Sequence, residues 1–119
     1  MKRLIHVFTV LCLSTAAIAL EAGVLLAAAY MYARSLWFVM GLHFAWNFTE
    51  GGVFGASVSG YASPGLLAGR FRGGDVLTGG VFGPEASLVA VLLCLGAGVA
   101  LALLARRRGL VVRPRWRRA

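Results

Sequence analysis

The sequence predicts an all-α polytopic membrane protein with about three transmembrane helices and a glycine-rich loop before the last one. The chain has 119 residues, of which 60% are hydrophobic and 13% are charged, and its mean hydropathy is +0.82. A soluble domain of this size could not bury so much apolar surface, because small domains have a high surface-to-volume ratio. The apolar residues form long runs without period-two alternation, which favours membrane helices over a β-barrel.

Three segments are long enough to cross a bilayer, whose hydrocarbon layer needs about 20 helical residues. We expect helices near residues 4–32, 35–58 and 84–106. The third contains an uncharged run of 20 residues, 86–105. A cleaved signal peptide is the alternative for the first segment, since residues 17–19 resemble a cleavage site, but the sequence stays hydrophobic beyond them and favours a continuous helix.

The segment before the third helix is rich in glycine. Residues 57–84 contain eight glycines and two prolines, a composition that disfavours helix, and we expect an ordered or semi-ordered loop outside the membrane. Pro84 and Glu85 suit the first turn of the helix that follows, where proline is tolerated and a carboxylate meets the positive end of the helix dipole.

Basic residues concentrate at the C-terminus. The net charge is +8, and seven of the twelve basic residues follow Ala105, within a tail that also holds Trp116. A basic tail directly after an apolar span is typical of contact with anionic lipid head groups, and it predicts a cytoplasmic C-terminus. We therefore expect the lipid bilayer as a partner and no nucleic acid.

The candidate site lies in the second segment. His43 and Asn47 are four residues apart in an apolar run, so a helix places them on one face, one turn apart. Polar side chains inside a bilayer are costly, and such a pair indicates a functional site. The alternative is that the two side chains only join helices by hydrogen bonds.

Two carboxylates accompany this pair. Glu50 follows His43 by seven residues on the same face and is a weak catalytic candidate, which we expect to be solvated near the helix end. Glu21 lies deep in the first apolar segment, where a structural partner such as Arg34 or a backbone group is expected.

The residues Ser35-Leu36-Trp37, the run from Gly41 to Phe48 and the glycines after it resemble the third motif region of the CPBP intramembrane proteases, also called the CAAX prenyl protease or Abi family. The resemblance covers roughly residues 14–105. It implies a helical membrane enzyme with a cavity open toward the cytoplasmic side. In that cavity a glutamate would activate water, while histidines and an asparagine, here His43 and Asn47, would stabilise the oxyanion. It also allows a divalent metal, with His43 as the candidate ligand.

Two family motifs are absent from the chain. The sequence has no Glu-Glu pair followed by arginine and no Phe-x-x-x-His. We therefore interpret residues 1–119 as a partial domain of this type with a basic tail at 106–119, from a truncated gene product or a misassigned start, and expect no peptide cleavage by this chain alone.

Two function classes follow from this sequence. The first is a peptide-hydrolysing intramembrane endopeptidase, located in a bacterial plasma membrane and acting on a peptide or membrane-protein substrate. The second is a non-catalytic small membrane protein that binds a partner or lipid through its helices and basic tail.

Overall fold

The computed structural model describes residues 1–112, so the predicted roles of Trp116 and of the arginines after position 112 lie outside the described residues. The described elements are helix α1 (Lys2–Ala33), helix α2 (Leu36–Asn47) continued by a π-helical segment η1 (Phe48–Val53), three short turns α3 (Asp75–Thr78), η2 (Gly80–Phe82) and η3 (Pro84–Ala86), and helix α4 (Leu88–Arg107). Within residues 1–112 there is no strand, only one isolated bridge between Val58 and Tyr61. The all-α prediction is confirmed.

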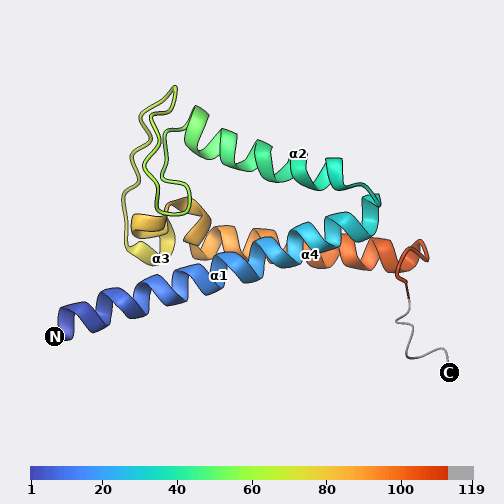
Figure 1. Ribbon diagram of the computed structural model, residues 1–119, viewed down its shortest axis with the longest axis horizontal. Coiled ribbons are helices and arrows are strands. Elements are labelled where there is room, and N and C mark those ends of the chain that lie inside the picture. The colour runs from blue at the N-terminus through green and yellow to red at the C-terminus, as the bar shows by residue number, and fades with distance from the viewer. Residues whose placement is uncertain (113–119) are drawn as a thin grey trace.

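The three long helices alternate in direction. Helices α1 and α4 lie against each other and run the same way, whereas α2 returns in the opposite direction on one side of them (Figure 1). Their shared end is joined by a cation–π contact, in which the Arg108 guanidinium lies 4.8 Å from the centre of the Tyr32 ring. The loop between η1 and α3 therefore lies at the opposite end of the molecule from the end of α4 (Figure 1).

Small residues form the contact between α1 and α4. Ala28, Ala29 and Ala105 are buried, and a Cβ added to Gly98 would lie 3.0 Å from Cγ1 of Val24 on α1. Small side chains allow helix backbones to approach closely, which is how membrane helices associate without a hydrophobic driving force between them.

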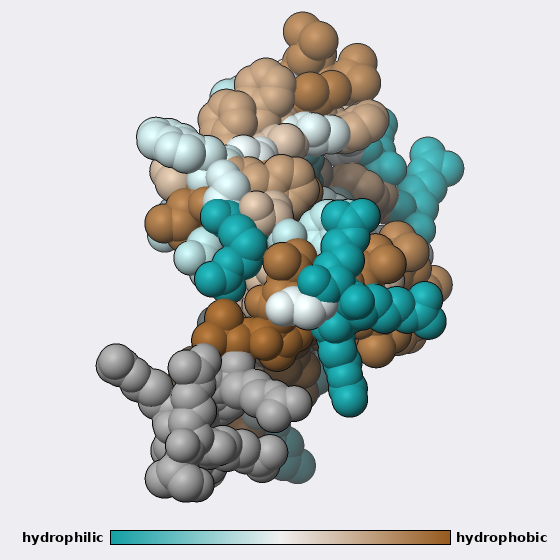
Figure 2. All heavy atoms as spheres, turned by 90° about the vertical axis from the view of Figure 1, so that its right-hand side faces the viewer, coloured by the Kyte–Doolittle hydropathy of each residue, from teal (hydrophilic) through white to brown (hydrophobic). Residues whose placement is uncertain are grey.

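Most large apolar side chains face outward, as expected for a protein surrounded by lipid. Leu92 and Leu93 on α4 are 62% and 67% exposed, and no large side chain within residues 1–112 is fully buried. Two described helices, α1 and α4, are long and apolar enough to cross a membrane. The end of the molecule where α4 stops carries hydrophilic side chains beside apolar ones (Figure 2), in keeping with the exposed Arg106 and Arg107 of its last turn.

The second and third helices differ from the predicted ranges. The helical run that begins at Leu36 ends at Val53 instead of residue 58, because it widens into a π-helical segment at the Gly51-Gly52 pair and then leaves the helix. The last helix begins at Leu88 instead of residue 84. Ser87 is extended, with φ −75° and ψ 149°, and its Oγ accepts a hydrogen bond from the Ala90 N–H at 3.1 Å. This is an N-cap, so Pro84 and Glu85 form a separate 3-10 turn before the helix.

The glycine-rich loop is ordered by close backbone contacts. Gly83 has φ +102°, and a Cβ placed there would lie only 1.8 Å from the Ser57 carbonyl oxygen. Gly55 and Gly65 are similarly close, since a Cβ on Gly65 would lie 2.1 Å from the Gly55 nitrogen. Glycine is needed at these positions because no side chain fits between the two backbones.

Candidate active site

A small cavity lies between α1, α2 and the turn before α4. Its volume is about 130 Å³, and its polar lining comprises Glu21 from α1, His43 and Asn47 from α2, Ser59 from the loop, and Glu85 from η3. Because α2 is helical from Leu36 to Asn47, the four-residue spacing turns the His43 and Asn47 side chains toward the same cavity. Asn47 is half-buried and His43 is exposed, so the imidazole can be reached from outside.

Glu21 is the most isolated polar group of this cavity. Its side chain is 3% exposed, and its buried Oε2 has no hydrogen-bond partner within residues 1–112. The expected partner Arg34 is 13 residues farther along the same helix, or about 20 Å away at 1.5 Å per residue, and its guanidinium instead lies 5.7 Å from the Tyr30 ring centre. Of the two partners that we expected, Arg34 or a backbone group, Arg34 is therefore not the one. A buried carboxylate oxygen without a partner is costly, so its position requires an explanation.

Glu85 shapes the rim of the cavity. Its Oε1 accepts hydrogen bonds from the Ser59 N–H at 2.5 Å and from the Ser59 hydroxyl at 2.7 Å. Ser59 has φ 49°, a left-handed conformation that is uncommon for a residue with a side chain, and the two bonds to Glu85 hold it. The Glu85 side chain is thereby joined to the loop across 26 positions of sequence.

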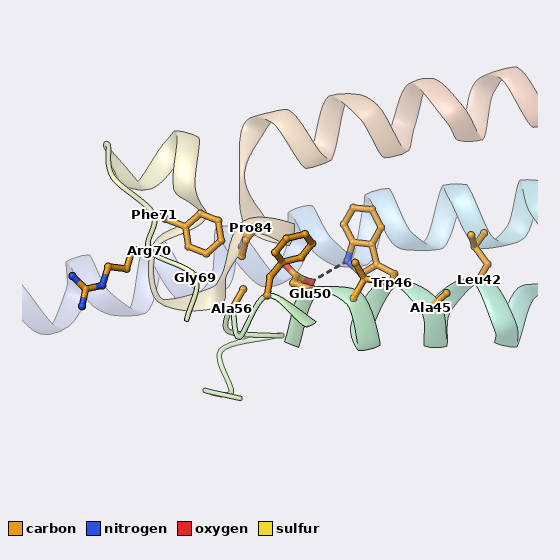
Figure 3. A pocket seen from close by; sticks show the side chains of 11 residues that line it. Leu42, Ala45, Trp46, Glu50, Ala56, Gly69, Arg70, Phe71 and Pro84 are labelled. Atoms are coloured by element: carbon orange, nitrogen blue, oxygen red, sulfur yellow. Dashed lines mark hydrogen bonds between the residues drawn. The ribbon is translucent and has the colours of Figure 1, made fainter. Parts of the chain in front are cut away.

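Glu50 does not face solvent as we expected. It is 8% exposed, its Oε1 accepts the Glu85 N–H at 3.0 Å, and its Oε2 accepts the Trp46 Nε1–H at 3.1 Å (Figure 3). The expectation of a solvated Glu50 was wrong because the π-helical segment turns inward beneath the 84–86 turn. Both of its oxygens are engaged, so the carboxylate fastens α2 to η3.

A larger apolar groove adjoins the small cavity. It has a volume of about 650 Å³ and is lined mainly by apolar side chains from α2, the loop and η3 (Figure 3). Leu42 and Trp46 line both spaces, so these two side chains form the wall between the apolar groove and the polar cavity. The arrangement can hold an apolar molecule beside a set of polar groups.

The described residues do not form a metal centre by themselves. Within residues 1–112, no three side chains of histidine, cysteine, aspartate or glutamate are grouped closely enough to hold a metal ion. A metal bound by His43 would therefore need ligands that this part of the chain does not supply.

Sequence reasoning selected His43 and Asn47, which line one cavity, but it missed the carboxylates that face them. The available signal for Glu21 was its position, since an ionisable residue in the middle of an apolar helix is a functional-site candidate. No sequence signal pointed to Glu85 and Ser59, because their contact depends on how the loop folds back.

Comparison with protein families found one match. Residues 3–49 match the family described as type II CAAX prenyl endopeptidase Rce1-like, a stretch that covers nearly all of α1, α2 and the first residues of η1. Searches of curated proteins and of solved structures found no match. The matched segment contains Glu21, His43 and Asn47. This match supports membership of the CPBP family of CAAX-protease-type membrane endopeptidases.

Proposed function

We propose that the protein is an intramembrane endopeptidase that hydrolyses a peptide bond of a membrane-associated substrate, with His43 and Asn47 as the groups that polarise the scissile carbonyl. The observation that supports this most directly is that both side chains line one small cavity together with a buried carboxylate. Hydrogen-bond donors that the fold holds in fixed positions stabilise a developing oxyanion better than freely reorienting donors in water.

The apolar groove supports a membrane-associated substrate. At about 650 Å³ it is large enough for several apolar side chains or a hydrocarbon chain, and it shares the wall of Leu42 and Trp46 with the polar cavity. Only the side chains of Leu42 and Trp46 separate a peptide segment in the groove from the cavity that His43 lines.

The experiment reconstitutes the chain in liposomes, beside a version extended upstream to include the two missing family motifs, and supplies fluorogenic peptides, both lipidated and unmodified. We do not expect cleavage by the chain alone, so the variants are compared in whichever of the two versions cleaves. We expect His43→Ala and Asn47→Ala each to lower kcat/KM by about 10²–10³-fold, the usual effect of removing one oxyanion donor. The matched control is His6→Ala, because His6 is an exposed histidine near the start of α1 and lines neither space. Equal activity of His43→Ala and the control would contradict the proposal.

The second candidate is a non-catalytic membrane protein that binds a lipid or a partner. The absence of the family's Glu-Glu pair from the sequence favours it, as does the mainly apolar lining of the large groove. In that case the peptides or lipids would bind to the reconstituted protein, and neither the unmodified chain nor a His43 variant would release a cleavage product.

A further inference from the structure

We propose that the glycine-rich loop, residues 57–84, is inserted into the head-group layer of one leaflet, where its apolar side chains contact lipid and Arg70 and Arg72 bind the phosphates of anionic lipids. The composition of this segment predicts a loop outside the membrane, whereas its folded surface is unsuited to water. The inference goes beyond the proposed function, and its test does not require cleavage of any peptide.

The loop exposes many large apolar side chains. Leu66 is 85% exposed, Tyr61 80% and Val81 79%. Its other large apolar side chains that are more than half exposed are Leu67, Phe71, Val76 and Leu77. Single exposed apolar residues are ordinary on a protein surface, but a concentration of them marks contact with a protein or a membrane.

Backbone hydrogen bonds keep these side chains on the outside. The Leu66 N–H donates to the Gly52 carbonyl oxygen at 2.8 Å, and the Gly60 N–H donates to the Phe82 carbonyl oxygen at 3.0 Å. The loop is thereby fastened to η1 and to η2. Turning the apolar side chains inward would break these hydrogen bonds, so the loop does not cover its own apolar surface.

The loop lies beside a part of α1 that extends past α4. The two helices end together at the contact of Arg108 with Tyr32, and α1 has 32 residues whereas α4 has 20. At 1.5 Å per residue, α1 therefore extends past the start of α4 by about 18 Å. Along the long axis of the molecule, the loop lies between the N-terminus of α1 and the start of α4 (Figure 1), and Ser59 of the loop lines the same cavity as Ile18 of α1.

This part of α1 is itself apolar, which places the loop within the membrane boundary. Residues 4–32 contain no lysine or arginine, and Glu21 is their one acidic residue. As a helix they are about 43 Å long, at 1.5 Å per residue. A bilayer with its head-group layers is about 40–45 Å thick. Lys2 and Arg3 then lie at the outer edge of the leaflet, and the loop, which is nearer to α4, lies in the head-group layer.

The charges of the loop suit anionic lipid. Its charged residues are Arg70, Arg72 and Asp75, which give a net charge of +1. Both arginines are exposed, and the Arg70 guanidinium points away from the apolar groove (Figure 3). Guanidinium groups bind phosphate through paired hydrogen bonds, and tyrosine, here Tyr61, is enriched at the head-group level. Arginines beside exposed apolar side chains therefore match the layer in which phosphates meet acyl chains.

The test places a fluorescent probe on the loop of the full chain in liposomes. In a variant without natural cysteines (Cys12→Ala with Cys94→Ala), Leu66→Cys or Val76→Cys carries the fluorophore NBD. We expect lipids with a nitroxide near the head group to quench both probes, and aqueous iodide to quench them several-fold less than it quenches the fluorophore free in buffer. Val99→Cys, at a 54% exposed position near the middle of α4, is the lipid-facing reference.

Two results would overturn the insertion of the loop. Iodide quenching of either loop probe as strong as that of the free fluorophore would place the loop in water. Protection from iodide and from the nitroxide lipids alike would mean that protein, such as a second copy of the chain, covers the loop. Circular dichroism of each labelled variant establishes that it folds.

The role of the arginines is tested at the Leu66→Cys probe with nitroxide-labelled phosphatidylglycerol and phosphatidylcholine. The anionic lipid should be enriched beside the probe by about fivefold for each arginine near the surface, and Arg70→Gln with Arg72→Gln should remove the enrichment. The control, Arg106→Gln with Arg107→Gln, removes the same charge from the opposite end of the molecule and should leave the enrichment unchanged (Figure 1). Equal quenching by both lipids, or an enrichment that survives the loss of Arg70 and Arg72, would overturn the assignment of these arginines.

Discussion

Helix α4 lies close to α1 at Gly98, and replacing this residue tests the packing that supports the site. A Cβ at Gly98 would lie 3.0 Å from Cγ1 of Val24 and 3.2 Å from both the backbone nitrogen and the Cα of Leu25. The last two atoms belong to the backbone of α1 and cannot rotate away. Gly98→Ala therefore requires α1 and α4 to shift by a few tenths of an ångström at Leu25, four residues beyond Glu21 on α1.

Gly96 supplies the matched control on the same helix. It is exposed, and a Cβ added there would meet nothing within 4 Å. Both substitutions gain the same helix propensity, about 1 kcal/mol for alanine over glycine, so the difference between them isolates the steric cost. Overpacking by one methyl group typically costs about 1–3 kcal/mol. We expect Gly98→Ala to be less stable than Gly96→Ala by about that amount.

The assay is unfolding in detergent micelles by heat or by added sodium dodecyl sulphate, followed by circular dichroism. Gly96→Ala should match or exceed the unmodified chain in stability, and Gly98→Ala should unfold at a lower temperature than Gly96→Ala. Equal midpoints for the two variants would refute the packing of α1 on α4 at this position. A Gly98→Ala variant more stable than Gly96→Ala would refute it more strongly.

Two further predictions concern Glu50 and the orientation of the chain. Glu50→Gln should lower the free energy of unfolding by about 1–3 kcal/mol in the same assay, because an amide has only one accepting oxygen for the two donors Trp46 Nε1–H and Glu85 N–H. The control is Asp75→Asn. Equal losses of stability in both variants would contradict a structural role of Glu50. A fluorescent reporter fused after Ala119 should be active in the cytoplasm, because seven arginines follow Ala105 at the end of the apolar run. Activity of a phosphatase fusion on the outer side would contradict that orientation.

The sequence predicted the helices from features that are local. The uncharged run 86–105 and the apolar first segment contain no competing signal, so the helices could be placed with boundaries wrong by only a few residues. The boundaries that moved depend on capping. Ser87 begins α4 through its own side chain, and the Gly51-Gly52 pair ends the second helix through a π-helical segment.

The site could be predicted only in part, because half of it depends on contacts between distant residues. The spacing of His43 and Asn47 is enough to place them on one helix face. The hydrogen bonds from Ser59 to Glu85 and from the Glu85 N–H to Glu50 join positions 26 and 35 residues apart, and they form only when the glycine-rich loop closes over the helix ends. No periodicity in the sequence contains that information.

The fold places two expectations from the sequence in conflict. Glu85 lies three residues before the first residue of α4, whereas Arg106 and Arg107 lie in its last turn. The carboxylate rim of the cavity and the basic end are therefore separated by a helix of 20 residues, about 30 Å long. That length equals the thickness of the hydrocarbon layer. If α4 spans the bilayer and its arginines are cytoplasmic, the His43 cavity lies toward the opposite leaflet, away from the cytoplasmic side implied by the family resemblance. Helices α1 and α4 run in parallel (Figure 1). The opposite orientation of the chain in the membrane would therefore bring the cavity to the cytoplasmic side, but it would also place the arginines on the outer side. The reporter fusion therefore also determines from which side a substrate reaches His43.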